Sequence, residues 1–215
     1  EHLTQILNSM RFNDEDIEYF KSLNTFDDKF LNFLKNFKFE CDIWSVPEGS
    51  VIFPYEPIMT VRGPAVQAQL IETIALLIIN HESLIATKSN RIKRAAKGRA
   101  VMEFGARRAQ GIDACVYGAK ASYIAGIDGT SNVLTGKLFN IPVLGTMAHS
   151  WVQMFDTELE AFKAFAKSFP NNCVLLVDTY NTLQSGIPNA IKTFDEILKP
   201  MGIRPKGIRL DSGDL

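Results

Sequence analysis

The sequence predicts an α/β protein, and two observations carry this prediction. From residue 99 onward, strand-like and helix-like segments alternate, a pattern that implies right-handed crossovers and parallel strands. Before that point, short helical patterns and a proline-rich region lead into one long helix. We therefore divide the chain into residues 1–64, 65–98 and 99–215: a small mixed region, a connecting helix and the first part of a parallel α/β domain.

The N-terminal region combines short helices with short strands. Phenylalanine and leucine recur at helical spacing within residues 30–37, and Asn13 or Asp14 is a candidate N-cap for an earlier helix. After a Pro-Glu-Gly turn, residues 51–53 and 58–61 are strand candidates. The prolines of this stretch favour edge strands and tight turns over the centre of a sheet.

A long helix is predicted from about Ala65 to Ala96. Leucine and isoleucine recur there at three- and four-residue spacing, and Gly98 supplies the stop. The last turns of this helix are rich in lysine and arginine. We interpret these cations as favourable partners of the negative end of the helix dipole rather than as an anion site.

Strands and helices of the alternating region follow directly from its hydrophobic pattern. The predicted strands are Val101–Phe104, Ser122–Ala125, Ile141–Leu144, Val174–Val177 and Gly207–Leu210. The predicted helices are Ala109–Ala121, Ser131–Phe139, Glu158–Phe169 and Ile187–Leu198. A doubly wound open sheet and a barrel both satisfy this pattern. No G-x-G-x-x-G loop follows the first strand, which weakens a dinucleotide-binding interpretation.

Composition excludes several classes of protein. A hydrophobic share of 46% and a charged share of 22% are typical of a soluble globular protein, and a net charge of −1 disfavours a nucleic-acid partner. The 3 cysteines form no C-x-x-C pair, so we expect buried thiols in a reducing cytoplasm rather than disulfides or structural zinc. No signal peptide is visible, and the longest apolar run, residues 74–79, is too short to span a membrane.

Polar side chains follow the ends of several predicted strands. The segments are G-A-R-R at 105–108, G-T-M-A-H-S at 145–150, D-T-Y-N-T at 178–182 and R-L-D-S-G-D at 209–214. Charged and hydroxyl groups at the carboxyl ends of successive parallel strands are the layout of an active site in an α/β barrel. This repetition favours the barrel over the open sheet.

Arg107 and Arg108 are the first candidate binding residues. A guanidinium group is always charged and presents a planar fork of donors that matches two phosphate oxygens. Gly105 beside them lets backbone approach a ligand closely. Taken alone, an arginine pair is more often a surface feature, but at a strand end within this pattern it predicts a phosphorylated substrate.

His149 is the main candidate for chemistry, because it lies between Thr146 and Ser150 in a loop of small residues at a strand end. A neutral imidazole in that setting can act as a general base or as a nucleophile toward phosphorus. His2 and His81 lack such a setting, and we interpret them as structural.

Two aspartates from neighbouring strands accompany this histidine. Asp178 and Asp211 could bind Mg²⁺ or ribose hydroxyls, since hard cations take carboxylate and phosphate oxygens together. A cap on the following turn is an equally good interpretation of Asp178. Asp128, within Gly-Ile-Asp-Gly-Thr, is read as a turn or helix cap.

These segments together resemble nicotinate phosphoribosyltransferases. The resemblance rests on E-F-G-A-R-R-A-Q-G, G-T-M-A-H-S-W-V, V-D-T-Y-N-T with Ser185-Gly186, and G-I-R-L-D-S-G-D-L, in this order over residues 103–215. Residues 47–98 are also similar to the segment that precedes the barrel in that family. The resemblance implies an N-terminal α+β domain followed by an irregular α/β barrel, both incomplete here.

The resemblance also implies an activity in NAD biosynthesis. The family condenses nicotinate with 5-phosphoribosyl 1-pyrophosphate to nicotinate mononucleotide and pyrophosphate, with coupled ATP hydrolysis. The histidine that becomes phosphorylated falls on His149, and the phosphate-binding arginines fall on Arg107 and Arg108. ATP is then a co-substrate, and a homodimer in the cytoplasm is expected.

The remaining site residues follow from the same motifs. Arg209 corresponds to the group near the pyridine carboxylate, Asp211 to a catalytic carboxylate near the ribose and pyrophosphate, and Thr146 to a nicotinate contact. We also expect Ser150, Ser212 and Asp178 to contact substrate. Asp178 and Asp211 would hold Mg²⁺ through the substrate pyrophosphate.

The sequence departs from the family in two respects. The N-terminal D-L-Y-x-L-T segment with its stacking aromatic is absent, and so are the last barrel strands with the 5′-phosphate cradle. The chain also begins without Met and ends directly after a strand-like run, so we expect an internal fragment. A nicotinamide or quinolinate phosphoribosyltransferase is the alternative enzyme, and a non-catalytic fragment or binding module is the alternative of another class.

Overall fold

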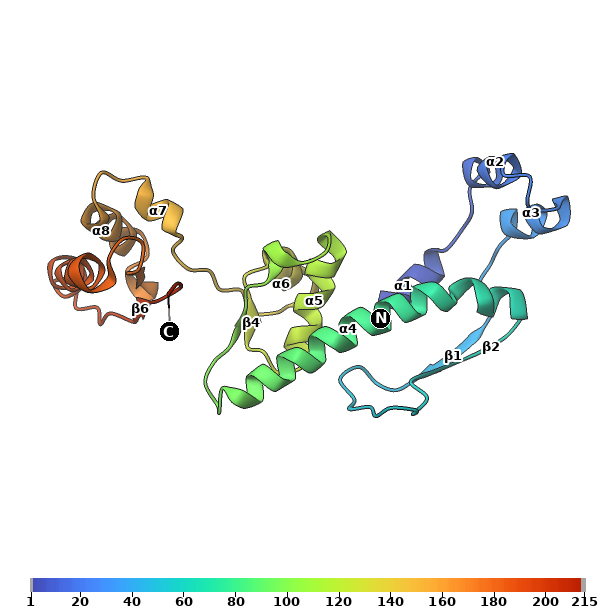
Figure 1. The fold of residues 1–215 in the computed structure, drawn as a ribbon, viewed down its shortest axis with the longest axis horizontal. Helices are drawn as coiled ribbons and strands as arrows, with labels where there is room; N and C mark the ends of the chain where they lie inside the picture. Colours follow the sequence, from blue (N-terminus) through green and yellow to red (C-terminus); the bar gives the residue numbers. More distant parts are fainter. Residues whose placement is uncertain (1, 214–215) are drawn as a thin grey trace. The chain divides into compact units, whose positions relative to one another are not determined.

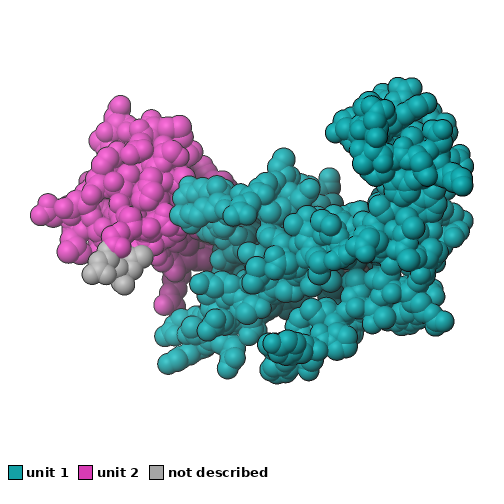
Figure 2. Space-filling model, turned by 45° about the vertical axis from the view of Figure 1, so that its right-hand side comes forward, with its two compact units in different colours: residues 1–144 teal, residues 145–215 magenta. Residues whose placement is uncertain are grey.

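The structure, a computed structural model, describes residues 2–213 and contains two compact units, residues 1–144 and residues 145–215 (Figure 2). Asp214 and Leu215, which end the last sequence motif, lie outside the described residues. The boundaries that the sequence suggests near residues 64 and 98 stay a prediction.

The first unit begins with α1 (His2–Ser9), α2 (Asp14–Ser22) and α3 (Asp28–Lys35) (Figure 1). Asn13 caps α2 as predicted: its side-chain oxygen accepts the Asp16 N–H at 2.9 Å, and the Asp16 carboxylate accepts the Asn13 N–H at 2.8 Å. Such a reciprocal pair satisfies two amide groups that the first helical turn leaves without partners. The short helices predicted for this region are therefore confirmed.

Helices α2 and α3 pack through phenylalanine side chains. Ring contacts run through Phe12, Phe20, Phe26, Phe30, Phe33 and Phe37. Most are edge-on or tilted, the arrangement that the ring quadrupole favours. Leu31 and Leu34 of α3 are also buried, so several residues at helical spacing within 30–37 pack inward.

A β-hairpin of β1 (Asp42–Ser45) and β2 (Met59–Arg62) follows. The strand expected at 58–61 is confirmed, whereas the strand expected at 51–53 is wrong, and β1 was missed. Residues 51–53 lie in the loop between the strands, where the Phe53 N–H bonds to the Glu56 carboxylate at 2.9 Å in a local turn. A proline on either side of that glutamate further prevents strand pairing.

Helix α4 (Ala65–Ala95) is the 31-residue helix that the sequence predicts (Figure 1). Ile71 and Ala75 are buried against Leu3 and Leu7 of α1, and the hairpin adds apolar side chains to the same cluster. Gly98 follows the helix with a φ of +84°, a backbone conformation that suits glycine.

Near its C-terminus, α4 places Lys93 against Asp128 at 2.5 Å. The hydrogen bond from Lys93 and a second one from the Val101 N–H hold the pKa of Asp128 below its ordinary value. Asp128 is therefore structural, although it binds Lys93 and the Val101 N–H rather than forming the turn or helix cap that the sequence suggested.

By length and composition alone, α4 could also cross a membrane, since an 18-residue window within it has a mean hydropathy of 1.4. The uninterrupted apolar run at residues 74–79 is short, whereas the mean hydropathy also counts the apolar residues on either side of it. One such helix is a weak indication, and core helices of globular proteins meet the same criterion.

After α4 come β3 (Met102–Glu103), the 3-10 turn η1 (Ala106–Arg108), α5 (Ile112–Ile124), β4 (Gly129–Thr130) and α6 (Val133–Phe139). Strands β3 and β4 are parallel, and Val143 adds one parallel bridge to Thr130. This arrangement confirms a strand–helix–strand crossover.

Two strand predictions in this region need correction. Residues 122–125 form the end of α5 and the residue that caps it, because Ser122 is buried against α4, where its hydroxyl accepts a bond from Ser89 at 2.9 Å. The strand comes later, at β4. Residues 141–144 contribute only the single bridge at Val143.

The second unit contains α7 (His149–Gln153), α8 (Glu158–Ser168), the 3-10 turn η2 (Pro170–Asn172), β5 (Val174–Leu176), the π-helical turn η3 (Thr182–Gly186), α9 (Ile187–Thr193), the π-helical turn η4 (Phe194–Leu198) and β6 (Gly207–Arg209). Strands β5 and β6 are parallel, with Leu175 opposite Ile208. The two strands and the helices predicted at 158–169 and 187–198 are confirmed.

The core of the second unit forms between β5 and the helices around it. Its buried members include Val152, Phe162, Leu175, Leu176, Val177 and Leu198. Gly186 makes this packing possible, because a Cβ at that position would lie 1.8 Å from the Val177 carbonyl oxygen. The segment after β5 therefore folds back directly onto the strand that it leaves.

All three cysteines are free, as the sequence predicts. Cys173 is fully buried in the core, and burial raises the pKa of its thiol to about 11, which leaves it inert. Cys41 and Cys115 are only partly buried, so the expectation of burial holds fully for Cys173 alone.

Candidate functional site

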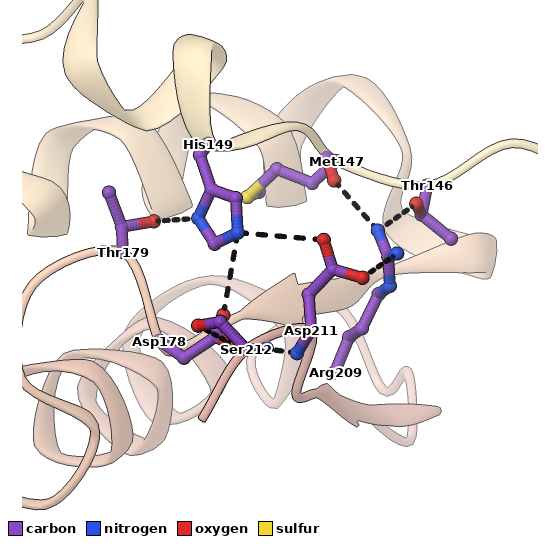
Figure 3. Close-up of polar contacts among 8 residues, drawn as sticks. All are labelled: Thr146, Met147, His149, Asp178, Thr179, Arg209, Asp211 and Ser212. Carbon is purple, nitrogen blue, oxygen red and sulfur yellow. Dashed lines mark hydrogen bonds and ion pairs between the residues drawn. The ribbon is translucent and has the colours of Figure 1, made fainter. Parts of the chain in front are cut away.

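The carboxyl ends of β5 and β6 bring together most of the predicted site residues (Figure 3). Parallel strands end at the same edge of a sheet, so Asp178, two residues after β5, meets Asp211, two residues after β6. The segment that leads into α7 contributes further side chains to the same cluster. The cluster comprises Thr146, Met147, His149, Asp178, Thr179, Arg209, Asp211 and Ser212.

His149 occupies the first position of α7, with its ring between two kinds of partner. Its Nδ1 atom lies 3.1 Å from the hydroxyl oxygen of Thr179. Its Nε2 atom lies 3.6 Å from Asp211 Oδ2 and 3.9 Å from Asp178 Oδ1. Two carboxylates on the Nε2 side favour a proton on that nitrogen, which leaves the lone pair of a neutral ring on Nδ1.

Asp178 binds the turn that carries Asp211. Its Oδ2 atom accepts the backbone N–H of Asp211 at 2.6 Å, the N–H of Ser212 at 2.7 Å and the hydroxyl of Ser212 at 2.8 Å. Burial opposes ionisation of this side chain, which is 5% exposed, but the hydrogen bonds to the charged form hold its pKa below the ordinary value.

Asp178 Oδ1 faces His149 and is buried without a hydrogen-bond partner among the described residues. One oxygen of this carboxylate thus organises the turn, and the other presents negative charge to the imidazole.

Arg209 joins the two sides of the cluster. One of its terminal nitrogens pairs with Asp211, and the other donates to the hydroxyl of Thr146 and to the carbonyl of Met147, the latter at 3.4 Å. The side chain is 25% exposed. The guanidinium is therefore fixed in orientation while part of it still faces solvent.

Not every predicted residue joins this cluster. Ser212 does, whereas Ser150 is exposed in α7, and no contact among the described residues links it to the others. Thr179 was missed, although it directly follows Asp178 in the same strand-end motif and that position was the available signal.

Arg107 and Arg108 lie in the first unit, on η1, and both are exposed. The turn is closed by a bond from the Arg108 N–H to the Gly105 carbonyl at 2.8 Å. Arg108 also lines a pocket of about 270 Å³ together with Glu103 and Cys115.

The predicted magnesium ligands, Asp178 and Asp211, supply two carboxylates at one place. Among residues 2–213, no group of three or more histidine, cysteine, aspartate or glutamate side chains has the arrangement of a metal site. A cation here would need further oxygen ligands from a substrate.

Parallel strand–helix–strand units whose carboxyl ends carry a histidine, two carboxylates and an arginine are typical of α/β-barrel enzymes. Comparison with known protein families agrees with this class. Two family models match the chain: the nicotinate phosphoribosyltransferase N-terminal domain over residues 1–80, and the nicotinate phosphoribosyltransferase family over residues 99–215. The chain belongs to the nicotinate phosphoribosyltransferase family.

Individual relatives carry the same name. The chain is 46% identical over 215 residues to a nicotinate phosphoribosyltransferase of Mycobacterium tuberculosis, covering 99% of this chain and 45% of the relative. It is 46% identical to the Bacillus subtilis protein, over 100% of this chain and 43% of that one. The human protein is 32% identical, over 98% and 48%. The chain thus spans less than half the length of these relatives.

Solved structures show the same fold. The crystal structure of human nicotinic acid phosphoribosyltransferase matches with a TM-score of 0.90 at 32% identity, over 99% of this chain and 52% of that chain. Nicotinate-nucleotide pyrophosphorylase from Pyrococcus furiosus matches with a TM-score of 0.70 at 28% identity, over 80% and 43%. These matches confirm the predicted α/β fold, present here in part.

Proposed function

We propose that the protein is an ATP-dependent nicotinate phosphoribosyltransferase, which condenses nicotinate with 5-phosphoribosyl 1-pyrophosphate in the biosynthesis of NAD. The observation that carries this proposal is the position of His149 between Thr179 and the carboxylates of Asp178 and Asp211, in a chain of this family. We place the protein in the cytoplasm as a homodimer.

His149 serves as the phosphoryl acceptor. The Nδ1 lone pair attacks the γ-phosphorus of ATP, an N–P bond forms, the P–O bond to ADP breaks, and the electron pair leaves with ADP. Asp178 and Asp211 stabilise the positive charge that this attack creates on the ring. The hydroxyl of Thr179, 3.1 Å from Nδ1, is positioned to donate to a phosphoryl oxygen once the bond has formed.

Arg209 orients the acidic substrate. Its bonds to Asp211 and Thr146 fix the guanidinium plane. The side chain is therefore ordered before nicotinate binds, and pairing with the nicotinate carboxylate costs little conformational entropy. Thr146 contributes a further contact to nicotinate. A carboxamide carries no charge to pair with this arginine, which favours nicotinate over nicotinamide as the substrate.

Arg107 and Arg108 bind the phosphoribosyl donor through bidentate bonds to phosphate oxygens. Departing pyrophosphate gains negative charge as the ribosyl centre becomes oxocarbenium-like, and cations near it lower that barrier. Ser150 and Ser212 complete the set of proposed substrate contacts.

Magnesium is the metal that fits the available ligands. Asp178 offers a buried Oδ1 atom that has no hydrogen-bond partner among the described residues, and the Asp211 side chain is 35% exposed. Both are the hard oxygen ligands that Mg²⁺ prefers. A bound Mg²⁺ would neutralise charge on the pyrophosphate group.

The first prediction tests the phosphorylated residue in the full-length protein. Incubation with γ-labelled ATP is expected to give acid-labile, base-stable label that His149→Ala abolishes. His81→Gln is the matched control, because His81 bonds to the Ala114 carbonyl outside the cluster and should leave labelling unchanged.

Label that persists in His149→Ala would reject this assignment. Absence of pyrophosphate release from phosphoribosyl pyrophosphate and nicotinate by the wild-type protein would reject the activity itself and favour a non-catalytic role.

A further inference from the structure

Glu103 lies immediately before the turn that carries the arginine pair, and each oxygen of its carboxylate accepts a hydrogen bond. It ends β3, directly opposite Thr130 of β4. Oε1 accepts the backbone N–H of Gly105, and Oε2 accepts the hydroxyl of Thr130 at 2.6 Å. Thr130 is fully buried, so one end of this connection is fixed in the interior.

The same connection continues toward α6. The Thr130 hydroxyl oxygen accepts the N–H of Asn132 at 3.0 Å, and Asn132 caps α6 by accepting the N–H of Thr135 at 3.2 Å. The backbone runs in parallel, because the Ser131 N–H donates to the Glu103 carbonyl at 3.0 Å. Glu103 is therefore part of a continuous hydrogen-bonded path between β3, β4 and the first turn of α6.

The other end of the path sets the turn that carries the arginines. Gly105 permits the close approach of the carboxylate, since a Cβ there would lie 2.9 Å from Glu103 Oε1. The carbonyl of the same glycine accepts the Arg108 N–H at 2.8 Å and so closes η1. The position of Gly105 thus determines the position of the turn that carries Arg107 and Arg108.

We propose that Glu103 is a positioning residue for the phosphoribosyl donor: it ties the Gly105–Arg108 turn to β4, so that both guanidinium groups reach the donor phosphates in register. This inference rests on the proposed function. Glu103 acts through the turn rather than by contact with substrate, since a carboxylate would repel phosphate.

The chemistry of the two bonds predicts a graded response. A carboxylate accepts from both donors at once. Glutamine has one accepting oxygen, so it can keep the bond to Gly105 while its amide group faces the Thr130 hydroxyl, whose oxygen already accepts from Asn132. Alanine removes both bonds and leaves the buried Thr130 hydroxyl without its acceptor.

The second prediction follows and uses the full-length protein with steady-state kinetics in both substrates. Glu103→Ala is expected to raise KM for phosphoribosyl pyrophosphate about tenfold or more, with KM for nicotinate changed less than about twofold. Glu103→Gln is expected to fall between wild type and alanine. Glu18→Ala is the matched control, because Glu18 is an exposed glutamate on α2.

A thermal melt on each variant separates positioning from folding. If Glu103→Ala lowers Tm too far for assay, Glu103→Gln and Thr130→Val carry the test, and both must raise the donor KM selectively. Combined, the two changes should cost less than the sum of their separate effects, because they break the same connection.

Failure of this inference and failure of the proposed function are distinguishable. Donor KM unchanged in Glu103→Ala, with Arg107→Lys or Arg108→Lys raising it, overturns the role of Glu103 and leaves the function standing. If Glu103→Ala lowers Tm and raises KM for both substrates in parallel, Glu103 has only a structural role, and the proposed positioning role is also overturned. Donor KM unchanged in all of these variants rejects both the arginine assignment and the role of Glu103.

Discussion

At the scale of single residues, the arrangement around the imidazole shows how one carboxylate serves two purposes. Asp178 must stay ionised to accept three hydrogen bonds with Oδ2 and to present charge to His149 with Oδ1. A protonated or amidated side chain would accept the bonds of the Asp211–Ser212 turn through a neutral oxygen, which weakens them, and would present no charge to His149. The turn and the histidine therefore depend on the same charge.

The third prediction is that Asp178→Asn loses stability in a pH-dependent way. The folded-state pKa of Asp178 is lowered, so its contribution to stability is fully present above the ordinary aspartate pKa near 4 and is lost as pH falls through the folded value. At pH 7 we expect a loss of about 1–3 kcal/mol, because hydrogen bonds to a charged acceptor are stronger than those to a neutral amide oxygen.

Urea unfolding of both proteins at pH 7 and near pH 3 measures this difference. The gap between wild type and Asp178→Asn should narrow at the lower pH. A gap of the same size at both values would show that the charge of Asp178 does not contribute.

The fourth prediction concerns substrate selectivity. Arg209→Gln in the full-length protein should lower kcat/KM for nicotinate by roughly 10²-fold, because the carboxylate of nicotinate would then lose its cationic partner. Nicotinamide should change little, so the ratio between the two substrates should collapse. A parallel fall for both substrates would move the acid-recognising role away from Arg209.

Much of this cluster could be predicted from the sequence. His149, Asp178, Arg209 and Asp211 follow from one rule, that polar residues after parallel strands gather at one edge. The contact of Thr179 with His149 was missed, although Thr179 directly follows Asp178 in the same strand-end motif. Metal ligation by Asp178 and Asp211 stays a prediction.

At the scale of elements, the segment after β5 is the tightest part of the second unit. Gly186 ends η3 against the Val177 carbonyl, and this contact holds the residues between them, which include Asp178 and Thr179. The strand and the turn are thus packed as one piece.

The fifth prediction is that Gly186→Ala destabilises the protein by about 1–3 kcal/mol, since backbone must shift to admit the methyl group. Activity should fall as well, because the displaced segment carries two partners of His149. Gly145→Ala is the matched control for stability, with nothing within 4 Å of its Cβ position. Thermal unfolding and turnover check both effects, and a stable, active Gly186→Ala variant would contradict them.

Element predictions failed where tertiary contacts overrode local pattern. The apolar residues at 122–125 read as a strand by composition, yet the bond between Ser122 and Ser89 marks the packing of α5 on α4. The run at 51–53 is apolar but lies within a loop shaped by prolines and by Glu56. In both places the apolar run was too short for its periodicity to distinguish a helix, a strand and a loop.

At the scale of the whole molecule, the proposed functions fall into separate units. The arginines that we propose to bind the donor belong to the first unit, and the histidine cluster belongs to the second. Family models match both parts of the chain and place it among nicotinate phosphoribosyltransferases. Because the chain spans less than half of its relatives' length, the full reaction must be measured on the longer protein.

Adjacency along the chain makes the site sensitive to length. Asp178 and Thr179 are consecutive residues, yet they address opposite nitrogens of one ring. A deletion of one residue between β5 and this pair would bring Thr179 to the place of Asp178, and an insertion would bring Asp178 to the place of Thr179, so either change would alter the group beside a ring nitrogen. The number of residues here is therefore as constrained as their identity, and variation during evolution should accumulate by substitution outside this segment rather than by changes in its length.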